Sequence, residues 1–168
     1  MIDPVTIRAG LADDLATLTD IYNHYVVTSH VTFDITPFTV EQRADWYGHY
    51  APTGPHRLLV AERRGTPVGY ATSSPFRPKP AYRSSVETSV YLSPDATGTG
   101  LGRRLYTDLL GQLGAEGVHR AYAGIALPNE ASIALHLRSG FTPIGTYHEV
   151  GYKWGRYIDV AWFEREIT

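Results

Sequence analysis

A glycine-rich segment stands directly before a predicted helix, in the order Thr97-Gly-Thr-Gly-Leu-Gly102. The first N–H groups of a helix have no intrahelical acceptors and lie at the positive end of the helix dipole. Glycines at positions 98, 100 and 102 let the backbone approach an anion closely, and Arg103 and Arg104 add positive charge. The segment predicts a phosphate-binding turn, with a plain turn as the alternative.

Two common phosphate sites do not match this segment. A Walker loop requires a lysine before its Ser or Thr, and no lysine is present here. A dinucleotide-binding turn follows the first strand of a parallel sheet, whereas three or four antiparallel-looking strands precede Thr97. The context therefore disfavours dinucleotide binding.

Glu87 is the unusual residue in the strongest strand pattern of the sequence, residues 85–92. Strand alternation groups it with Ser89 and Tyr91 on one side; the other side carries Val86, Thr88, Val90 and Leu92. One interpretation is a general base in a cleft. The alternative, which the pattern alone favours, is a solvated glutamate or a partner for Arg83.

A later predicted helix carries two further polar candidates, Asn129 and His136. Asn is a preferred helix cap. Seven residues are nearly two full turns, so the two side chains share a face, and Gly140 suits a C-terminal cap. By spacing alone, His136 is better explained as a structural histidine than as a catalytic one.

The elements that position these residues alternate between strand and helix periodicity. The order β-α-α-β-β-β-α-β-α-β-β combines hairpins with β-α-β crossovers, so we expect an α/β (α+β) fold with a mixed sheet and helices on both faces. Thr39 and Gln42 form a candidate capping box for the second helix. Strands are predicted near residues 5–8, 58–62, 67–72, 85–92, 121–127, 142–149 and 158–166, and helices near residues 12–28, 39–50, 103–115 and 129–139.

Composition excludes several classes of protein. The length of 168 residues favours a single domain over residues 1–168, and 43% apolar residues suit a chain that buries a core. A net charge of -2 argues against nonspecific nucleic-acid binding. Zero cysteines exclude disulfides, metal–thiolate sites and a cysteine intermediate, and agree with a cytoplasmic location. No signal peptide or membrane-spanning segment is predicted.

Several motifs resemble those of one enzyme family. Thr97–Gly102 is similar to the Gln/Arg-x-x-Gly-x-Gly/Ala motif of the GNAT acetyltransferase superfamily. Asn129, Ser132, Leu135, His136, Gly140 and Phe141 fit its later helix motif. Within it, the chain resembles phosphinothricin and methionine sulfone/sulfoximine N-acetyltransferases through Ile21-Tyr-Asn-His-Tyr25, Val86-Glu-Thr-Ser-Val-Tyr91, Leu127-Pro-Asn129 and Gly151-Tyr-Lys153. The resemblance covers almost the whole chain, in the same order.

This resemblance implies a GNAT fold whose sheet of six to seven strands splays open to admit acetyl-CoA. The residues implied to bind it are the strand backbone of Val90, Tyr91 and Leu92, the loop Gly98, Thr99, Gly100, Leu101, Gly102 and Arg103, and Asn129. Thr97 replaces the family's Gln or Arg, so we expect somewhat weaker cofactor binding. His136 stands where an acid-acting tyrosine is common, a departure that the phosphinothricin group shares.

The resemblance also implies a reaction: acetylation of a small amino-acid analogue by direct transfer, as in detoxification. Glu87 would be the base, and His136 would assist it or relay the proton. An N–H near Val90 would stabilise the oxyanion. The acceptor would contact Phe33, Arg77, Lys79 and Tyr82, although a solvated charged loop explains the two cations equally well. No metal is implied, and a homodimer is expected. The alternatives are acetylation of another small amine and a non-catalytic acyl-CoA sensor.

Overall fold

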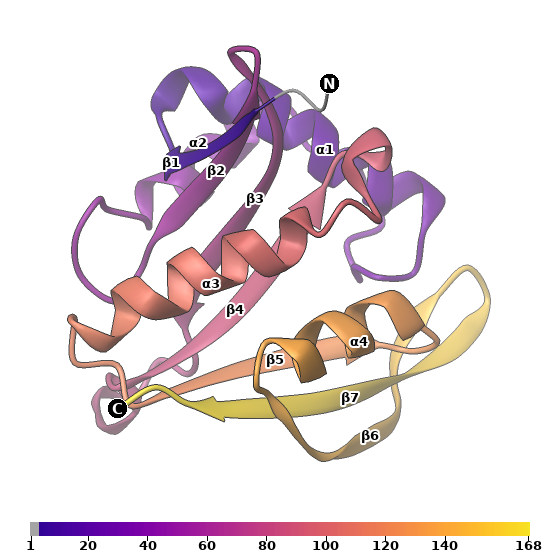
Figure 1. Ribbon diagram of the computed structural model, residues 1–168. Coiled ribbons are helices and arrows are strands. Elements are labelled where there is room, and N and C mark those ends of the chain that lie inside the picture. Colours follow the sequence, from indigo (N-terminus) through magenta and orange to yellow (C-terminus); the bar gives the residue numbers. More distant parts are fainter. Residues whose placement is uncertain (1–3) are drawn as a thin grey trace.

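Seven strands form one sheet in the computed structural model, which describes residues 4–168 of the chain. The spatial order is β1-β2-β3-β4-β5-β7-β6 (Figure 1). Every neighbouring pair is antiparallel except β4 with β5, so the expected mixed sheet is confirmed. The strands are β1 (Val5–Ala9), β2 (Leu58–Arg63), β3 (Thr66–Pro75), β4 (Ser85–Leu92), β5 (Arg120–Ala126), β6 (Thr142–Lys153) and β7 (Arg156–Glu166).

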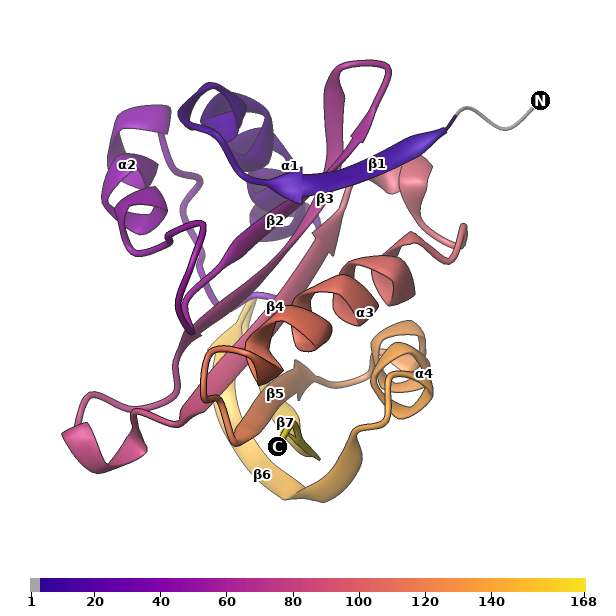
Figure 2. The ribbon, with the colours of Figure 1, turned by 60° about the vertical axis from the view of Figure 1, so that its left-hand side comes forward.

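Helices cover both faces of this sheet, as the crossover pattern predicts. Figure 2 shows α1 and α2 on one side of the strands and α3 and α4 on the other. The predicted capping box is present, because the Thr39 and Gln42 side chains each accept the other residue's backbone N–H. The helices are α1 (Leu15–Thr28), α2 (Val40–Gly48), α3 (Leu101–Gly114) and α4 (Glu130–Arg138), with short 3-10 turns at Ala12–Asp14, Pro80–Tyr82 and Pro94–Ala96.

The two faces bury separate sets of side chains, because successive strand residues point to opposite sides. In β2, Leu59 and Ala61 pack into the core beneath α3. Leu58 and Val60 pack into a second core, which also contains Leu18 of α1. The sheet therefore separates an α1/α2 side from an α3/α4 side, and each functional residue can be assigned to one of them.

The sheet opens between its two central parallel strands. β4 and β5 pair at only three positions, the last joining Glu87 to Tyr122. Beyond that point the ladder stops, and the Thr88 side chain donates to the Tyr122 carbonyl at 3.3 Å. At the far end of β4, the Tyr25 hydroxyl of α1 donates to the Leu92 carbonyl at 2.6 Å. Glu87 therefore stands where the strands part, at the opening that the family resemblance implies.

The β6–β7 hairpin is longer than the sequence pattern indicates, since β6 continues to Lys153 and β7 begins at Arg156. Glu149 has a positive φ of 54°, and the pairing register shifts between Tyr147 and Gly151. This irregularity breaks the alternation by which a strand is recognised, although the strand itself continues.

The loop after α1 is fixed to this hairpin by a buried lysine. Lys153 is 1% exposed, and its Nζ donates to the carbonyls of Val26, Ser29 and Thr32 at 2.8, 2.8 and 2.9 Å. Nearby, a Cβ on Gly151 would lie 2.2 Å from Cζ of Phe33, so only glycine admits that ring. The Gly151-Tyr-Lys153 motif therefore holds the segment that follows α1.

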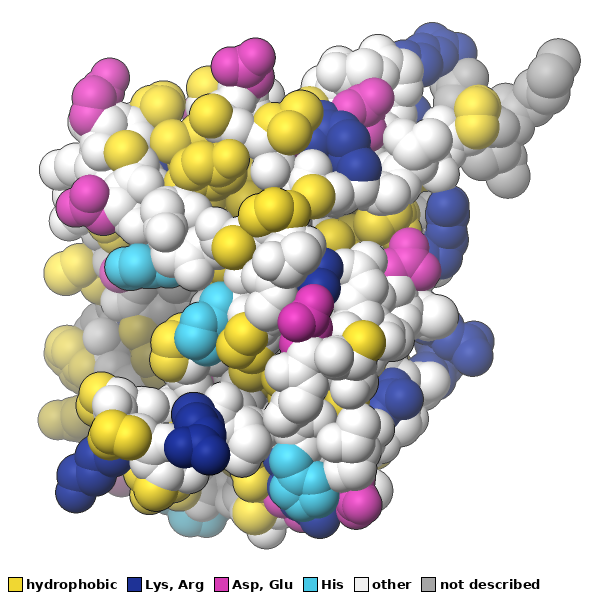
Figure 3. All heavy atoms as spheres, turned by 90° about the vertical axis from the view of Figure 1, so that its left-hand side faces the viewer, with side chains coloured by type: hydrophobic (Ala, Val, Ile, Leu, Met, Phe, Trp, Pro, Cys, Tyr) yellow, Lys and Arg dark blue, Asp and Glu magenta, His cyan; other side chains and the backbone are white. Residues whose placement is uncertain are grey.

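On the face that Figure 3 shows, surface charges are mixed rather than concentrated. Figure 3 shows Lys and Arg side chains interspersed with Asp and Glu over one face of the molecule, which agrees with the net charge of -2. Among the described residues, no helix has the length and apolar character required to cross a membrane.

Candidate active site

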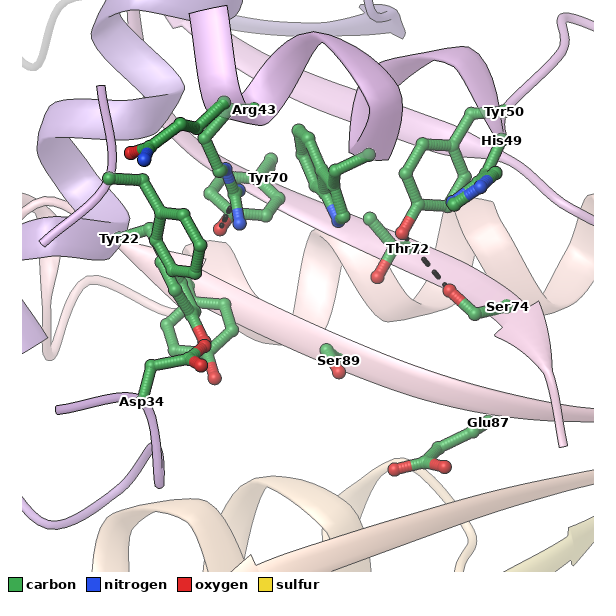
Figure 4. A pocket seen from close by; sticks show the side chains of 14 residues that line it. Tyr22, Asp34, Arg43, His49, Tyr50, Tyr70, Thr72, Ser74, Glu87 and Ser89 are labelled. Atoms are coloured by element: carbon green, nitrogen blue, oxygen red, sulfur yellow. Dashed lines mark hydrogen bonds between the residues drawn. The ribbon is translucent and has the colours of Figure 1, made fainter. Parts of the chain in front are cut away.

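A cavity of about 400 Å³ lies between the α1/α2 layer and the opened part of the sheet. Its floor is formed by side chains of β3 and β4, and its walls come from α1, α2 and the loop between them (Figure 4). Glu87, Ser89 and Tyr91 all line it, which confirms that alternation on β4 turns these three to one side. The cavity is lined by Tyr22, Asp34, Phe38, Gln42, Arg43, Trp46, His49, Tyr50, Tyr70, Thr72, Ser74, Glu87, Ser89 and Tyr91.

Glu87 is half-buried in this cavity. Burial raises the pKa of its carboxyl group above the ordinary value, because removal from water disfavours the charged form, and the positive charge of Arg77 partly opposes the rise. A carboxylate whose pKa is raised toward neutrality is a better proton acceptor than a solvated one. The environment of Glu87 thus suits a general base.

Two of the predicted acceptor residues, Arg77 and Tyr82, lie near the rim and do not line the cavity. Arg77 is exposed and stacks 4.3 Å over the Phe76 ring. Phe76 in turn stacks on Tyr122, with ring centroids 4.4 Å apart, and Tyr122 is paired with Glu87. Tyr82 is 43% exposed and meets the edge of Phe76. The structure thus brings Arg77 and Tyr82 around an aromatic surface beside Glu87.

The other two acceptor candidates are placed differently. Lys79 is exposed in the same loop as Arg77. Phe33 is 39% exposed and packs over Gly151 on the hairpin, outside the residues that line the cavity. Its neighbour Asp34 does line the cavity and accepts a hydrogen bond from the Tyr22 hydroxyl. Phe33 therefore adjoins the site through its loop rather than forming its wall.

The glycine-rich turn has the geometry that an approaching phosphate requires. Gly98 and Gly100 have positive φ angles of 72° and 80°, with open space where a Cβ would stand, and Gly100 caps α3. Thr97 and Thr99 turn their hydroxyls back onto the carbonyls of Pro94 and Ala96. Because these hydroxyls are bonded to carbonyls, an anion would accept its hydrogen bonds from the main-chain N–H groups at the start of α3. The residues present therefore fit the pyrophosphate of a coenzyme A derivative.

The remaining cofactor candidates border the same opening. The part of β4 beyond its pairing with β5 contains Val90, Tyr91 and Leu92. At the start of α3, Leu101 is buried whereas Arg103 is exposed. Gly102 lies against Leu135 of α4, since a Cβ there would approach Leu135 Cδ2 to 3.2 Å. Asn129 caps α4 by accepting the Ser132 N–H at 3.1 Å, which is the structural role that its type suggests.

His136 lies on the α3/α4 side and does not line the cavity. It is 3% exposed. Its Nδ1 donates to the Ser132 carbonyl at 2.7 Å, so Nε2 of the neutral ring accepts from the Tyr106 hydroxyl at 2.9 Å. Burial lowers the pKa of the ring. The structure thus gives His136 a buried, hydrogen-bonded environment on the α3/α4 side, outside the residues that line the cavity.

Several cavity residues were not predicted from the sequence. Arg43 is the most notable, because a guanidinium only 5% exposed lines the cavity wall. Its only sequence signal is Trp46, three residues later on the same helix, a spacing at which side chains meet. Tyr22 belongs to the Ile21-Tyr-Asn-His-Tyr25 motif, and the structure shows that it is buried on α1 and also reaches the cavity.

Comparison with known proteins agrees with this geometry. Residues 7–162 match the family model described as an acetyltransferase (GNAT) domain. The chain is 55% identical over 165 residues to a phosphinothricin N-acetyltransferase of Streptomyces coelicolor, covering 97% of this chain and 96% of that protein. It is 35% identical to an L-methionine sulfoximine/L-methionine sulfone acetyltransferase of Salmonella typhimurium, covering 97% and 95%.

A solved structure shares the fold over nearly the whole chain. It is a GNAT superfamily phosphinothricin acetyltransferase of Sinorhizobium meliloti in complex with AcCoA, with a TM-score of 0.89 and 36% identity, covering 96% of this chain and 88% of that one. The sheet that opens beside Glu87, the phosphate-type turn before α3 and a family match over residues 7–162 all agree. The chain therefore belongs to the GNAT family and is an N-acetyltransferase.

Proposed function

We propose that this enzyme transfers the acetyl group of acetyl-CoA to the amino group of a small amino-acid analogue, with phosphinothricin as the first candidate and methionine sulfoximine and sulfone as the next. The observation that carries the proposal is the position of Glu87, a half-buried carboxyl group at the last β4–β5 pair. It borders both the cavity and the opening of the sheet. The names of the S. coelicolor and S. typhimurium relatives supply the acceptor class.

The acceptor nitrogen must be neutral to attack. An α-ammonium group loses its proton at roughly pH 8, so Glu87 accepts that proton, directly or through a water. The nitrogen then bonds to the acetyl carbon, the carbon–sulfur bond breaks, and coenzyme A leaves as a thiolate that takes up a proton. A β4 N–H near Val90 stabilises the oxyanion. The chain contains no cysteine, which favours direct transfer over a cysteine-bound acetyl intermediate.

His136 enters this proposal as the buried partner of Tyr106. The Tyr106 hydroxyl donates to His136 Nε2, and Thr88, just beyond the last β4–β5 pair, donates to the Tyr122 carbonyl. Burial raises the pKa of Tyr106, so its hydroxyl stays protonated. We assign His136 the role of holding that hydroxyl in place beneath the opening of the sheet.

A homodimer is part of the proposal. Six large apolar or aromatic side chains of the β6–β7 hairpin are more than half exposed. Exposed apolar side chains gathered on one element are typical of a protein–protein contact, and we assign this one to a second copy of the chain. Arg77, Lys79 and Tyr82 are also exposed near the rim, where a partner subunit would enclose them. The exposed hairpin side chains are Ile144, Tyr147, Val150, Tyr152, Trp154 and Tyr157.

A thiol-release assay over an amine panel tests the activity. Phosphinothricin, methionine sulfoximine, methionine sulfone and ordinary amino acids are each supplied with acetyl-CoA, and kcat/KM is measured. We expect the highest value for phosphinothricin, and a tenfold preference corresponds to ~1.4 kcal/mol of transition-state binding. If an unrelated amine has the highest kcat/KM, that amine replaces phosphinothricin as the proposed acceptor. Binding of coenzyme A without release for any acceptor would indicate an acyl-CoA sensor instead.

Removal of the rim cations tests acceptor binding. We expect Arg77→Ala to raise the KM for phosphinothricin about tenfold, because a charged hydrogen bond contributes roughly 1.5–3 kcal/mol. Lys79→Ala should have a smaller effect, because the charge of Arg77 acts on Glu87, whereas Lys79 is exposed farther along the same loop. Steady-state kinetics with both substrates varied separates the cases: a change confined to the KM for acetyl-CoA would contradict the acceptor assignment.

A further inference from the structure

A buried arginine that forms no ion pair with any residue of the range 4–168 faces the inner end of the cavity. Arg43 extends from α2 into the cavity beside Tyr70, across from Glu87 (Figure 4). It is 5% exposed, and its Nε has no hydrogen-bond partner in the part of the chain that the structure describes. Among the described residues, its Nη2 reaches only the Tyr70 hydroxyl, at 3.5 Å, the outer limit of a hydrogen bond. A guanidinium carries five N–H donors, so most of its donors are unused.

The charge of Arg43 is equally uncompensated. Within residues 4–168, no carboxylate forms an ion pair with it. Asp34 and Glu87 line the same cavity, but Asp34 accepts from Tyr22 instead. Burying an unpaired charge costs several kcal/mol. A protein that keeps such a group beside a cavity has a use for it there.

Aromatic rings hold the guanidinium in place and leave its edge available. Its central carbon lies 3.8 Å from the Trp46 ring centroid and 4.4 Å from that of Tyr22, with Phe38 at 5.8 Å. Cation–π contacts of this kind offset part of the desolvation cost. They use the faces of the planar group, whereas hydrogen bonds to an oxyanion use its edge. The rings therefore orient Arg43 without consuming its donors.

The separation of Arg43 from Glu87 suits a substrate with two polar ends. Tyr22 and Tyr70, which flank Arg43, pack on Tyr91 with ring centroids 5.1 and 5.7 Å apart. Tyr91 and Glu87 lie four residues apart on one side of β4, which is about 13 Å along a strand. The cavity thus offers a proton acceptor at one end and a cation at the other. With a water between Glu87 and the acceptor amine, the rest of this length accommodates a side chain of three to four atoms. Such a side chain would end in an anionic group near Arg43.

We propose that Arg43 binds the anionic side-chain group of the acceptor, a phosphinate or a similar oxyanion, at the inner end of the cavity. This inference rests on the proposed function, and it divides recognition between two cations. Arg77, at the rim beside Glu87, takes the α-carboxylate, which is close to the reacting nitrogen. Arg43 takes the far end of the side chain and thereby selects for its charge.

Kinetics with matched acceptors tests this assignment. Phosphinothricin carries an anionic side-chain group, methionine sulfone a neutral polar one, and methionine an apolar one. We expect Arg43→Gln to raise the KM for phosphinothricin about tenfold to a hundredfold, the KM for methionine sulfone less, and the KM for methionine and acetyl-CoA little. Arg43→Lys keeps the charge but loses the planar donor edge, so its loss should be intermediate. Arg138→Gln, an exposed change on α4, is the control.

The outcomes separate this inference from the proposed function. An equal loss with all three acceptors, or no loss with phosphinothricin, overturns the role of Arg43 while acetyltransfer stands. If the wild-type enzyme acetylates none of the three, the proposed acceptor class is wrong. Calorimetric titration of phosphinothricin into the enzyme with coenzyme A then tests whether Arg43 binds the anion. Binding that Arg43→Gln weakens supports the anion site, and no binding to the wild type overturns it. Thermal melts check that each variant folds, with Arg43→Lys as the milder replacement.

Discussion

Glu87→Gln is expected to lower kcat/KM for acetylation about 10²- to 10⁴-fold near neutral pH, the range that a positioned general base contributes. The amide keeps the shape of the carboxylate but cannot accept a proton. Acetyl-CoA affinity should be unchanged, because Glu87 lines the acceptor cavity whereas the phosphate-type turn lies before α3. Steady-state kinetics and calorimetric titration with acetyl-CoA measure the two quantities.

The dependence of kcat/KM on pH tests the same role of Glu87. Only ionised Glu87 acts as a base, so kcat/KM of the wild type should fall as the pH drops through the pKa of Glu87, which burial raises above 4.5. A second loss at low pH comes from protonation of the acceptor amine. In Glu87→Gln the part of the fall that belongs to Glu87 disappears. The exposed Glu41→Gln is the matched control, and an unchanged rate in Glu87→Gln would remove Glu87 from the mechanism.

Glu87→Gln should lower activity without lowering the free energy of unfolding. The pKa of Glu87 is raised in the folded state, so the folded protein binds more protons than the unfolded chain between pH 4.5 and that pKa. Folding free energy is therefore lost as the pH rises through this window, and the loss persists at neutral pH. Glu87→Gln removes that cost, and we expect its melting temperature at pH 7 to equal or exceed that of the wild type. A large loss of activity without a loss of stability distinguishes a catalytic residue from a structural one.

Lys153→Met is expected to lower the free energy of unfolding by about 2–4 kcal/mol, because each buried polar group left without its partner costs roughly 1–3 kcal/mol. The ammonium donates to three carbonyls at and beyond the end of α1, and methionine fills the space but donates nothing. The relief of the buried charge offsets part of the loss, since burial lowers the pKa of Lys153. For a chain of this length the melting temperature should fall by about 4–16 °C.

The same substitution should reach the acceptor cavity. The segment that Lys153 holds includes Thr32, and it leads directly to Asp34, which lines the cavity and bonds to Tyr22. We therefore expect a higher KM for the acceptor along with the lower melting temperature. The only other lysine of the chain, Lys79, is exposed, so Lys79→Met is the control for stability. A melting temperature for Lys153→Met equal to that of the control would refute the anchoring role.

Local sequence signals determined the elements and the direction of their side chains. Alternation along β4 was enough to place Glu87 with Ser89 and Tyr91, because strand residues point to opposite sides in turn. The capping pair Thr39 and Gln42 was equally readable, since both partners lie within one helical turn. The glycine-rich turn belongs to this class too, because its positive φ angles are a property of consecutive residues.

Tertiary structure alone decided which side chains meet. Arg43 reads as a surface residue of α2, and Lys153 as a residue of a hairpin; each is buried only because distant segments pack over it. His136 follows the cap Asn129 on α4, and because α4 packs on the α3 side of the sheet (Figure 2), His136 does not line the cavity that Glu87 lines. Periodicity is encoded within about ten residues, whereas the burial and pairing of a charge depend on contacts between segments far apart in the chain. For that reason the sequence by itself determined the family, the elements and the face of Glu87, and only the folded structure determined the cavity and the cation at its inner end.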